Sequence, residues 1–179
     1  MNFQTGYHIF ETTLSIILFA MMAFIYHSIK KHHSNQIIKF KKLSDMAIEP
    51  TRGSEQAAGY DLYACINEPM VINPGDTRKV PTGISVELPK GTFAGIYARS
   101  GLATKQGLRP ANCVGVCDSD YRGEYIVAIH NDSDTLRTIE PGERIAQMIV
   151  SPYVSFAFQE VDNLSDTNRG DGGFGSTGK

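Results

Sequence analysis

The amino-acid sequence predicts an all-β domain, a sandwich or a barrel, on the strength of two observations. Apolar and polar residues alternate in short runs, as at Ile84, Val86 and Leu88, and a period of two is typical of strands with one buried face. Pro-Gly and related turn signals separate these runs. Many short strands at such spacing favour a sandwich or barrel, and we find no long amphipathic helix.

The strands and turns are expected in the following order. The first strand covers residues 36–43, and the same alternation recurs at Tyr125, Val127 and Ile129 and again at Val154, Phe156 and Phe158. A buried strand is expected over residues 144–150, and one short helix after Ser100, through residues 102–106. Turns are predicted at residues 73–76, 88–91 and 140–143, where Pro sets φ and Gly tolerates a positive φ.

Residues 1–35 form a separate hydrophobic segment. Residues 12–29 carry no formal charge unless His27 protonates, and as a helix they would be about 27 Å long, enough to cross a hydrocarbon core. Lysines follow this stretch and none precedes it, which predicts a single membrane span, a basic linker and a cytoplasmic domain. A peripheral helix remains an alternative. So does a later start at Met21 or Met22, which would give a soluble cytoplasmic protein.

Composition excludes several function classes. The chain has 179 residues and a net charge of −2, so no basic surface indicates a nucleic-acid partner. Three cysteines are too few for a disulfide framework or a closed zinc site, and we expect them to be small buried residues in a reducing compartment. His130 is the only histidine beyond residue 33. A general base in the domain is therefore expected to be a carboxylate.

The last eleven residues, 169–179, contain five glycines together with Arg169, Phe174, Ser176 and Thr177. Glycines let a backbone wrap closely around a ligand, an arginine grips phosphate oxygens through two hydrogen bonds, and an aromatic ring can stack on a base. The segment therefore predicts an arm that closes over a nucleotide. The alternative is a disordered Gly/Ser tail.

Two segments offer charged groups at predicted strand or helix ends. Asp61, the only charge in residues 57–64, is either a solvated turn residue or the holder of a metal-bound water. Arg99 and Ser100 precede the short helix, whose first amides can bind phosphate. Arg99 can instead be an ion-pair partner, and Ser100 a helix N-cap.

Two more segments place polar groups at the ends of apolar strands. In residues 112–124 an apolar strand runs into Asp118 and Asp120. A carboxylate at the mouth of an apolar pocket can act as a general base for water, although Asp also favours turns. In residues 144–150, Gln147 interrupts an apolar run and needs a hydrogen-bond partner.

Together and in this order, these five segments strongly resemble the trimeric deoxyuridine triphosphate nucleotidohydrolase (dUTPase) family over residues 36–179. The resemblance implies a jelly-roll-like, distorted β barrel over residues 36–165, a mobile arm over residues 166–179, and a homotrimer whose active sites are shared between subunits. It also implies hydrolysis of dUTP to dUMP and pyrophosphate with Mg²⁺. Such hydrolysis limits the incorporation of uracil into DNA and supplies dUMP for dTMP synthesis.

The resemblance also assigns roles to individual residues. Asp118 would be the general base, Tyr121 would pack against the deoxyribose and exclude a 2′-hydroxyl, and Asp61 would hold Mg²⁺ through water. Phe174 would stack over uracil. The remaining residues implied to contact the base or the phosphates are Arg99, Ser100, Gly101, Asn112, Gly115, Val116, Cys117, Gln147, Arg169, Gly175, Ser176 and Thr177.

The chain departs from the family pattern at Cys117, where an aliphatic residue is usual, and at Ala98, where Pro is common. Neither change removes a functional atom. Two other functions remain open: a dCTP deaminase with a similar barrel, against which Tyr121 and Phe174 argue, and a nucleotide sensor without catalysis, against which Asp118 and the complete tail argue.

Overall fold

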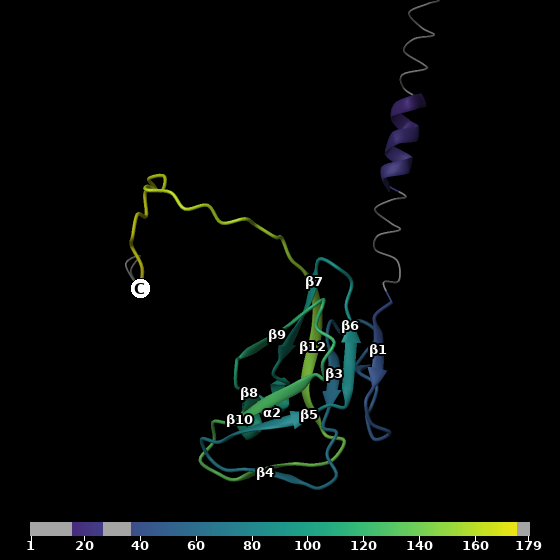
Figure 1. Ribbon diagram of the computed structural model, residues 1–179, viewed down its shortest axis with the longest axis vertical. Helices are drawn as coiled ribbons and strands as arrows, with labels where there is room; N and C mark the ends of the chain where they lie inside the picture. The colour runs from purple at the N-terminus through teal and green to yellow at the C-terminus, as the bar shows by residue number, and fades with distance from the viewer. Residues whose placement is uncertain (1–15, 27–36, 175–179) are drawn as a thin grey trace, which may run out of the picture.

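A computed structural model describes residues 16–26 and 37–174, and its central part is a distorted barrel of short strands (Figure 1). The strands form where the sequence alternates and end at the turn residues. In chain order the elements are β1 (Lys39–Lys42), β2 (Thr51–Arg52), β3 (Tyr60–Tyr63), β4 (Met70–Ile72), β5 (Thr77–Pro81), β6 (Ile84–Glu87), β7 (Thr92–Tyr97), α2 (Ser100–Gln106), β8 (Leu108–Pro110), β9 (Val114–Asp118), β10 (Ile126–Asn131), β11 (Arg137–Ile139) and β12 (Arg144–Pro152).

The strands of the described residues pair in antiparallel fashion in four sheets. The largest has the order β2-β3-β12-β7-β9, and the others are β5-β10-β8, β1-β6 and β4-β11. Because β12 lies between β3 and β7, Gln147 stands opposite both Asp61 and Tyr97. The predicted all-β barrel is confirmed.

The core lies where the inner faces of these sheets meet. Burying each large aliphatic side chain stabilises the fold by roughly 1.5–3 kcal/mol. Fully buried apolar side chains come from all four sheets and include Leu62, Ile72, Val80, Ile84, Leu108, Ile129, Ile139 and Ile145.

One polar side chain, Asn131, is completely buried among them. Its amide donates to the carbonyl oxygens of Ile72 and Thr135, both at 2.9 Å, and its Oδ1 accepts from the backbone N–H of Ser133 at 3.0 Å. Asn131 therefore ties the end of β10 to β4 and to the following turn.

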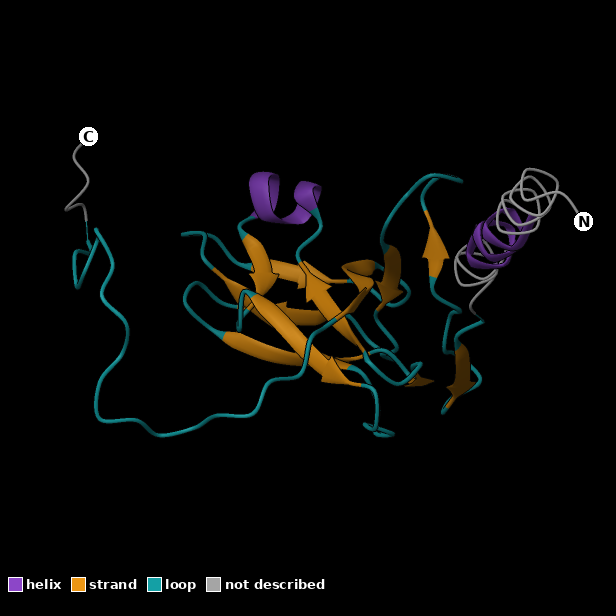
Figure 2. Cartoon of the chain, turned by 90° about the horizontal axis from the view of Figure 1, so that it is seen from above, coloured by secondary structure: helices purple, strands orange, loops and turns teal. Residues whose placement is uncertain are grey.

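The predicted turns and the short helix are confirmed. Gly75 and Gly91 adopt φ values of +76° and +80° in the first two turns, a conformation that favours glycine. The helix α2 runs from Ser100 and lies on the outside of the barrel next to β8 (Figure 2), with Leu102 buried beneath it.

Two predictions about apolar residues are wrong. Val154, Phe156 and Phe158 alternate as in a strand, yet β12 ends at Pro152, opposite the first residue of β7. Beyond it the chain leaves the barrel without a pairing strand among the described residues, and Phe158 is fully exposed. Cys113, expected to be buried, is also exposed.

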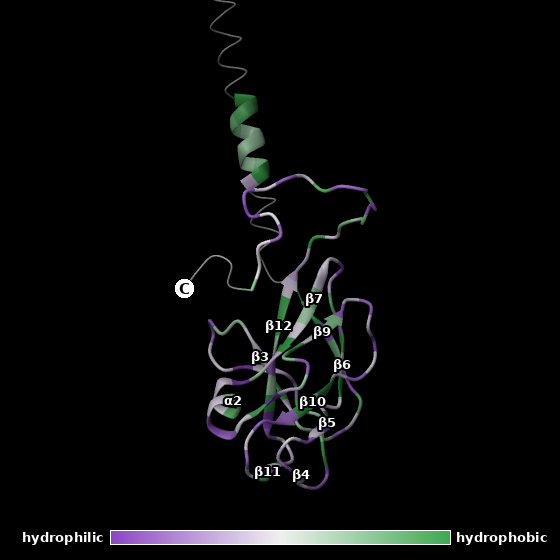
Figure 3. Cartoon of the chain, turned by 90° about the vertical axis from the view of Figure 1, so that its left-hand side faces the viewer, coloured by the Kyte–Doolittle hydropathy of each residue, from purple (hydrophilic) through white to green (hydrophobic). Residues whose placement is uncertain are grey.

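At the N-terminus, residues 16–26 form a helix of exposed apolar side chains (Figure 3). The predicted membrane span, residues 12–29, extends beyond the described residues at both ends, and the predicted basic linker, up to residue 35, lies outside them. Among the residues that the structure does describe, no helix is both long and apolar enough to cross a membrane. The predicted membrane anchor is therefore without support in the described part of the chain.

Candidate functional site

A cavity of about 310 Å³ opens between β9 and β10. The strand β9 belongs to the largest sheet and β10 to another, so the loop that joins them leaves a hollow instead of a closed hairpin. Five of the six residues predicted to contact the base or the sugar line it, together with Asp118, while Phe174 does not. The lining residues are Ile96, Asn112, Gly115, Val116, Cys117, Asp118, Tyr121, Glu124, Tyr125, Ile126, Val127 and Ala128.

The inner end of the cavity is formed where Asn112 lies against Gly115. A Cβ atom at Gly115 would come within 3.2 Å of the Asn112 amide nitrogen and 3.1 Å of the Ile96 Cβ, so a side chain here would displace the amide. The turn before β9 is tight, since the N–H of Val114 donates to the carbonyl of Asn112 at 2.6 Å. Because Gly115 has no side chain, the Asn112 amide can lie directly beside the strand.

Asp118 is the last residue of β9 and stands at the rim of the cavity. Alternation along the strand exposes Val116 and Asp118 and turns Cys117 inward. No residue of the described ranges donates a hydrogen bond to the Asp118 carboxylate. Asp118 also borders a second, wider hollow of about 670 Å³, together with Lys90 and Arg122.

Cys117 and Tyr125 lie behind the rim. Burial raises the pKa of the Cys117 thiol, and the negative charge of Asp118 adds to the rise. Burial also raises the pKa of Tyr125, with the neighbouring Cys117 contributing. Both groups are therefore neutral at physiological pH.

A second cluster of predicted site residues joins β3, β12 and the segment after β7. Asp61 is largely buried and accepts from Arg99 Nε at 3.0 Å through one oxygen and from Arg144 Nη1 at 3.2 Å through the other. Arg99 also donates to the carbonyl of Arg144 at 3.1 Å. The ion-pair alternative for Arg99 is thus what the structure shows, and these contacts fix its guanidinium.

Gln147 and Ser100 lie beside this cluster. The partner that Gln147 needs is the carbonyl of Ala98, to which its amide donates at 2.9 Å. Arg99, and not Ser100, occupies the N-cap position of α2, and no side chain caps the helix. Ser100 and Gly101 are exposed in its first turn, where the free N–H groups of a helix collect.

The two clusters are separated within one chain. On β7, Asp118 stands opposite Phe93 and Gln147 opposite Tyr97, and four residues of strand span about 13 Å. A hydrogen bond reaches about 3 Å. Asp118 is therefore too far from the Arg99 cluster of its own chain for their side chains to hydrogen-bond each other.

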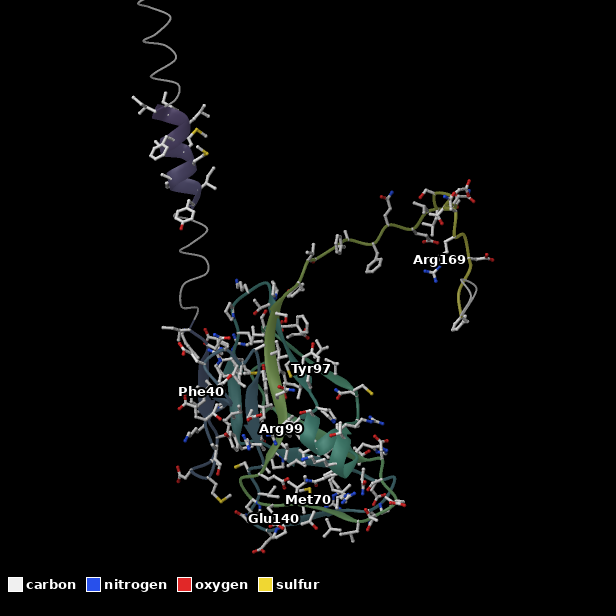
Figure 4. All side chains as sticks on the ribbon, turned by 180° about the vertical axis from the view of Figure 1, so that it is seen from behind. Phe40, Met70, Tyr97, Arg99, Glu140 and Arg169 are labelled. Atoms are coloured by element: carbon white, nitrogen blue, oxygen red, sulfur yellow. The ribbon has the colours of Figure 1, made fainter. Side chains whose placement is uncertain are left out.

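The arm is remote from both clusters. From Tyr153 to Phe174 nearly every residue is exposed, and Figure 4 shows Arg169 far from Arg99 and Tyr97. Arg169 Nε donates to the carbonyl of Gly172 at 2.8 Å, which folds the chain locally. Gly175, Ser176 and Thr177, also predicted to bind substrate, lie outside the described residues.

Comparison with known proteins now decides the family. The model of the dUTPase family matches residues 45–178. The chain belongs to the dUTPase family. The matched range holds every predicted dUTPase segment, from Asp61 to the glycine-rich arm.

Individual dUTPases are similar over most of their length. A deoxyuridine 5′-triphosphate nucleotidohydrolase of Desulfitobacterium hafniense is 48% identical over 130 residues, which is 72% of this chain and 86% of that protein. The rice (Oryza sativa subsp. japonica) protein of the same name is 46% identical over 142 residues, covering 79% and 81%. In structure, the dUTPase of Staphylococcus bacteriophage 80alpha with dUpNHpp superposes with a TM-score of 0.73 at 28% identity, covering 81% of this chain and 100% of that one.

Sequence reasoning within the dUTPase pattern missed two groups. The sequence predicts Arg144 only as the first residue of a strand, but in the structure Arg144 and Arg99 both form ion pairs with Asp61. The only sign of this in the sequence is a charged residue directly before an apolar run. Tyr125 was noted only for strand alternation, but it lines the cavity and stacks on Tyr121.

Proposed function

We propose that this chain hydrolyses dUTP to dUMP and pyrophosphate, so that it limits the incorporation of uracil into DNA and supplies dUMP for dTMP synthesis. Its dUTPase relatives carry the name of that activity. The observation that carries the proposal is the cavity between β9 and β10, which gathers five base- and sugar-contacting candidates around the exposed carboxylate of Asp118.

In this proposal Asp118 takes a proton from the water that attacks the α-phosphate. Its carboxylate is exposed at a cavity rim and accepts no hydrogen bond from the described residues, so a water can take that place. A base must lie within about 3 Å of the proton it removes. The adjoining 670 Å³ hollow leaves room for a triphosphate on the outer side of Asp118.

The other proposed roles are those that the family resemblance implies. Asn112 and the backbone of residues 115–117 would read the uracil edge, and Tyr121 would contact the deoxyribose. Arg99, Ser100, Gly101 and Gln147 would bind phosphate, which suits a fixed guanidinium beside the first turn of a helix. The arm residues Arg169, Phe174, Gly175, Ser176 and Thr177 would close over the nucleotide.

Asp61 suits Mg²⁺ only through water. An ionised carboxylate has about four acceptor positions, and Arg99 and Arg144 use one on each oxygen, which leaves room for hydrogen bonds from metal-bound waters. Mg²⁺ usually keeps several waters and binds substrate phosphates. When bound, it would neutralise charge on the triphosphate, while Asp61 keeps the two arginines in place.

A homotrimer with shared sites is part of the proposal. The 310 Å³ cavity with Asp118 and the Arg99 cluster lie about 13 Å apart along β7, and the arm leaves its own barrel. A symmetric assembly can bring the rim of one subunit to the arginine cluster of a second and the arm of a third.

The test is pyrophosphate release from dUTP, dCTP, dTTP and UTP by the full chain with Mg²⁺. Turnover of dUTP alone is the expected result. Ammonia release from dCTP would instead support a deaminase, and tight dUTP binding without turnover would support a sensor; either result contradicts the proposal.

A further inference from the structure

The ring of Tyr121 is held from two sides, although nearly half of the residue is exposed. On one side it stacks on Tyr125, with ring centroids 6.1 Å apart and planes inclined by 29°, which is the offset geometry that aromatic pairs prefer. Gly123 lies against the hydroxyl end of the ring, where a Cβ atom would overlap the Tyr121 hydroxyl. The Tyr121 hydroxyl also donates to the carbonyl of Glu124 at 3.1 Å.

Tyr125 is a fixed platform for this stack. The residue is 2% exposed, its N–H donates to the carbonyl of Ile84 at 2.9 Å, and its carbonyl accepts from Thr82 Oγ1 at 2.5 Å. The neighbouring Glu124 carboxylate accepts from the N–H of Gly83 at 2.7 Å. The loop that carries Tyr121 is thus fastened to the start of β6, and Tyr125 cannot move without breaking these contacts.

We infer that Tyr125 is a positioning residue for sugar selection. Its ring holds the Tyr121 ring at the place where a 2′-hydroxyl of the sugar would otherwise enter. This inference rests on the proposed function, in which Tyr121 contacts the deoxyribose. Tyr125 borders the cavity but is only 2% exposed, so its assigned contact is with Tyr121 and not with the substrate. Its effect is therefore on the choice between dUTP and UTP, not on the chemical step.

The ring carries this effect, not the hydroxyl. The Tyr125 hydroxyl is buried and makes no geometrically good hydrogen bond among the described residues, although the Cys117 thiol lies beside it and raises its pKa. A thiol is a weak partner, and a buried hydroxyl without a good partner destabilises the fold. Phenylalanine would keep the stack and remove the orphan oxygen. Leucine or methionine would remove the ring and let Tyr121 swing into the 310 Å³ cavity or away from it.

The experiment measures kcat and KM for dUTP and UTP with the full chain and four variants. Tyr125→Leu and Tyr125→Met remove the ring, Tyr125→Phe keeps it, and Ile129→Val controls for loss of core packing in β10, the strand that follows Tyr125. We expect the preference for dUTP over UTP to fall roughly three- to tenfold in the ring-less variants, the worth of one aromatic pair. The change should appear as a lower KM for UTP with little change in kcat for dUTP.

Tyr125→Phe should keep the wild-type preference and melt at the same or a higher temperature, and Ile129→Val should keep the preference while melting lower. An unchanged preference for dUTP over UTP in a folded ring-less variant would overturn the inference. A Tyr125→Phe variant that loses the preference as Tyr125→Leu does would also overturn it. If the wild-type chain turned over neither nucleotide, the proposed function would fail. The ratio of the affinities for dUTP and UTP, measured by calorimetry, would then still test whether Tyr125 affects the choice of sugar.

Discussion

Two inactive variants of this chain should restore each other's activity. Asp118→Asn removes the proposed base, and Ser100→Ala removes a phosphate contact whose hydroxyl caps nothing in α2, so both should fold. The two positions belong to clusters about 13 Å apart in one chain. If each site takes Asp118 from one subunit and Ser100 from another, random mixing in equal amounts leaves both intact in about a quarter of the sites.

The assay is dUTP turnover per subunit after co-expression of the two variants at equal dosage. The matched control mixes wild-type chains equally with chains that carry both substitutions. With shared sites this control also retains about a quarter of the activity, because the two donors again assort independently. With sites contained in one chain it would retain about half.

One pair of results would contradict a site shared between subunits. If the two single variants together show no more activity than each alone, and the control retains half, the site lies within one chain. The separation along β7 would then have to be closed by a rearrangement of that chain, and the trimer would not be needed for catalysis.

Three further outcomes are expected. Asp118→Asn should lower dUTP turnover by roughly 10²–10⁴ while calorimetry shows nearly unchanged binding of a non-hydrolysable analogue; an unchanged rate would remove it as base. Deleting residues 169–179 should abolish most turnover but leave the melting temperature and the oligomeric mass unaltered, since the hydrogen bond that Arg169 donates within the described residues goes to Gly172 of the same segment; an unfolded product would make the arm structural. Asn131→Ala should lower the free energy of unfolding in urea by roughly 2–4 kcal/mol, because it strands the carbonyls of Ile72 and Thr135.

Local features of the sequence were sufficient for the turns, the helix and most strands. A turn needs only its own residues, so the Asn73 to Asp76 turn with Gly75 at its positive φ could be predicted from four letters. The helix after Ser100 likewise ends on a local signal, the left-handed Gly107 at its C-terminus, although no side chain caps its start.

Pairing is not a local property, and there the predictions failed. Val154, Phe156 and Phe158 have the period of a strand, but a strand needs a neighbour, and β7 ends its pairing with β12 at Pro152. The same alternation is correct for β10, because β5 and β8 lie on either side of it. Whether an alternating segment forms a strand therefore depends on the neighbouring strands that the barrel supplies, and not on the residues of the segment alone.

The same difference between local signals and strand pairing applies to the candidate site. The motif order located Asp61, Arg99, Asp118 and Gln147, but only the sheet register shows that Asp118 stands apart from the other three. The register also changes the part played by Asp61. A carboxylate with one arginine on each oxygen is first of all the group that fixes Arg99 and Arg144, and any metal it serves must be reached through water. Asp61→Asn should therefore weaken phosphate binding even when Mg²⁺ is saturating, and a defect that excess Mg²⁺ fully corrects would show instead that metal contact is its main task.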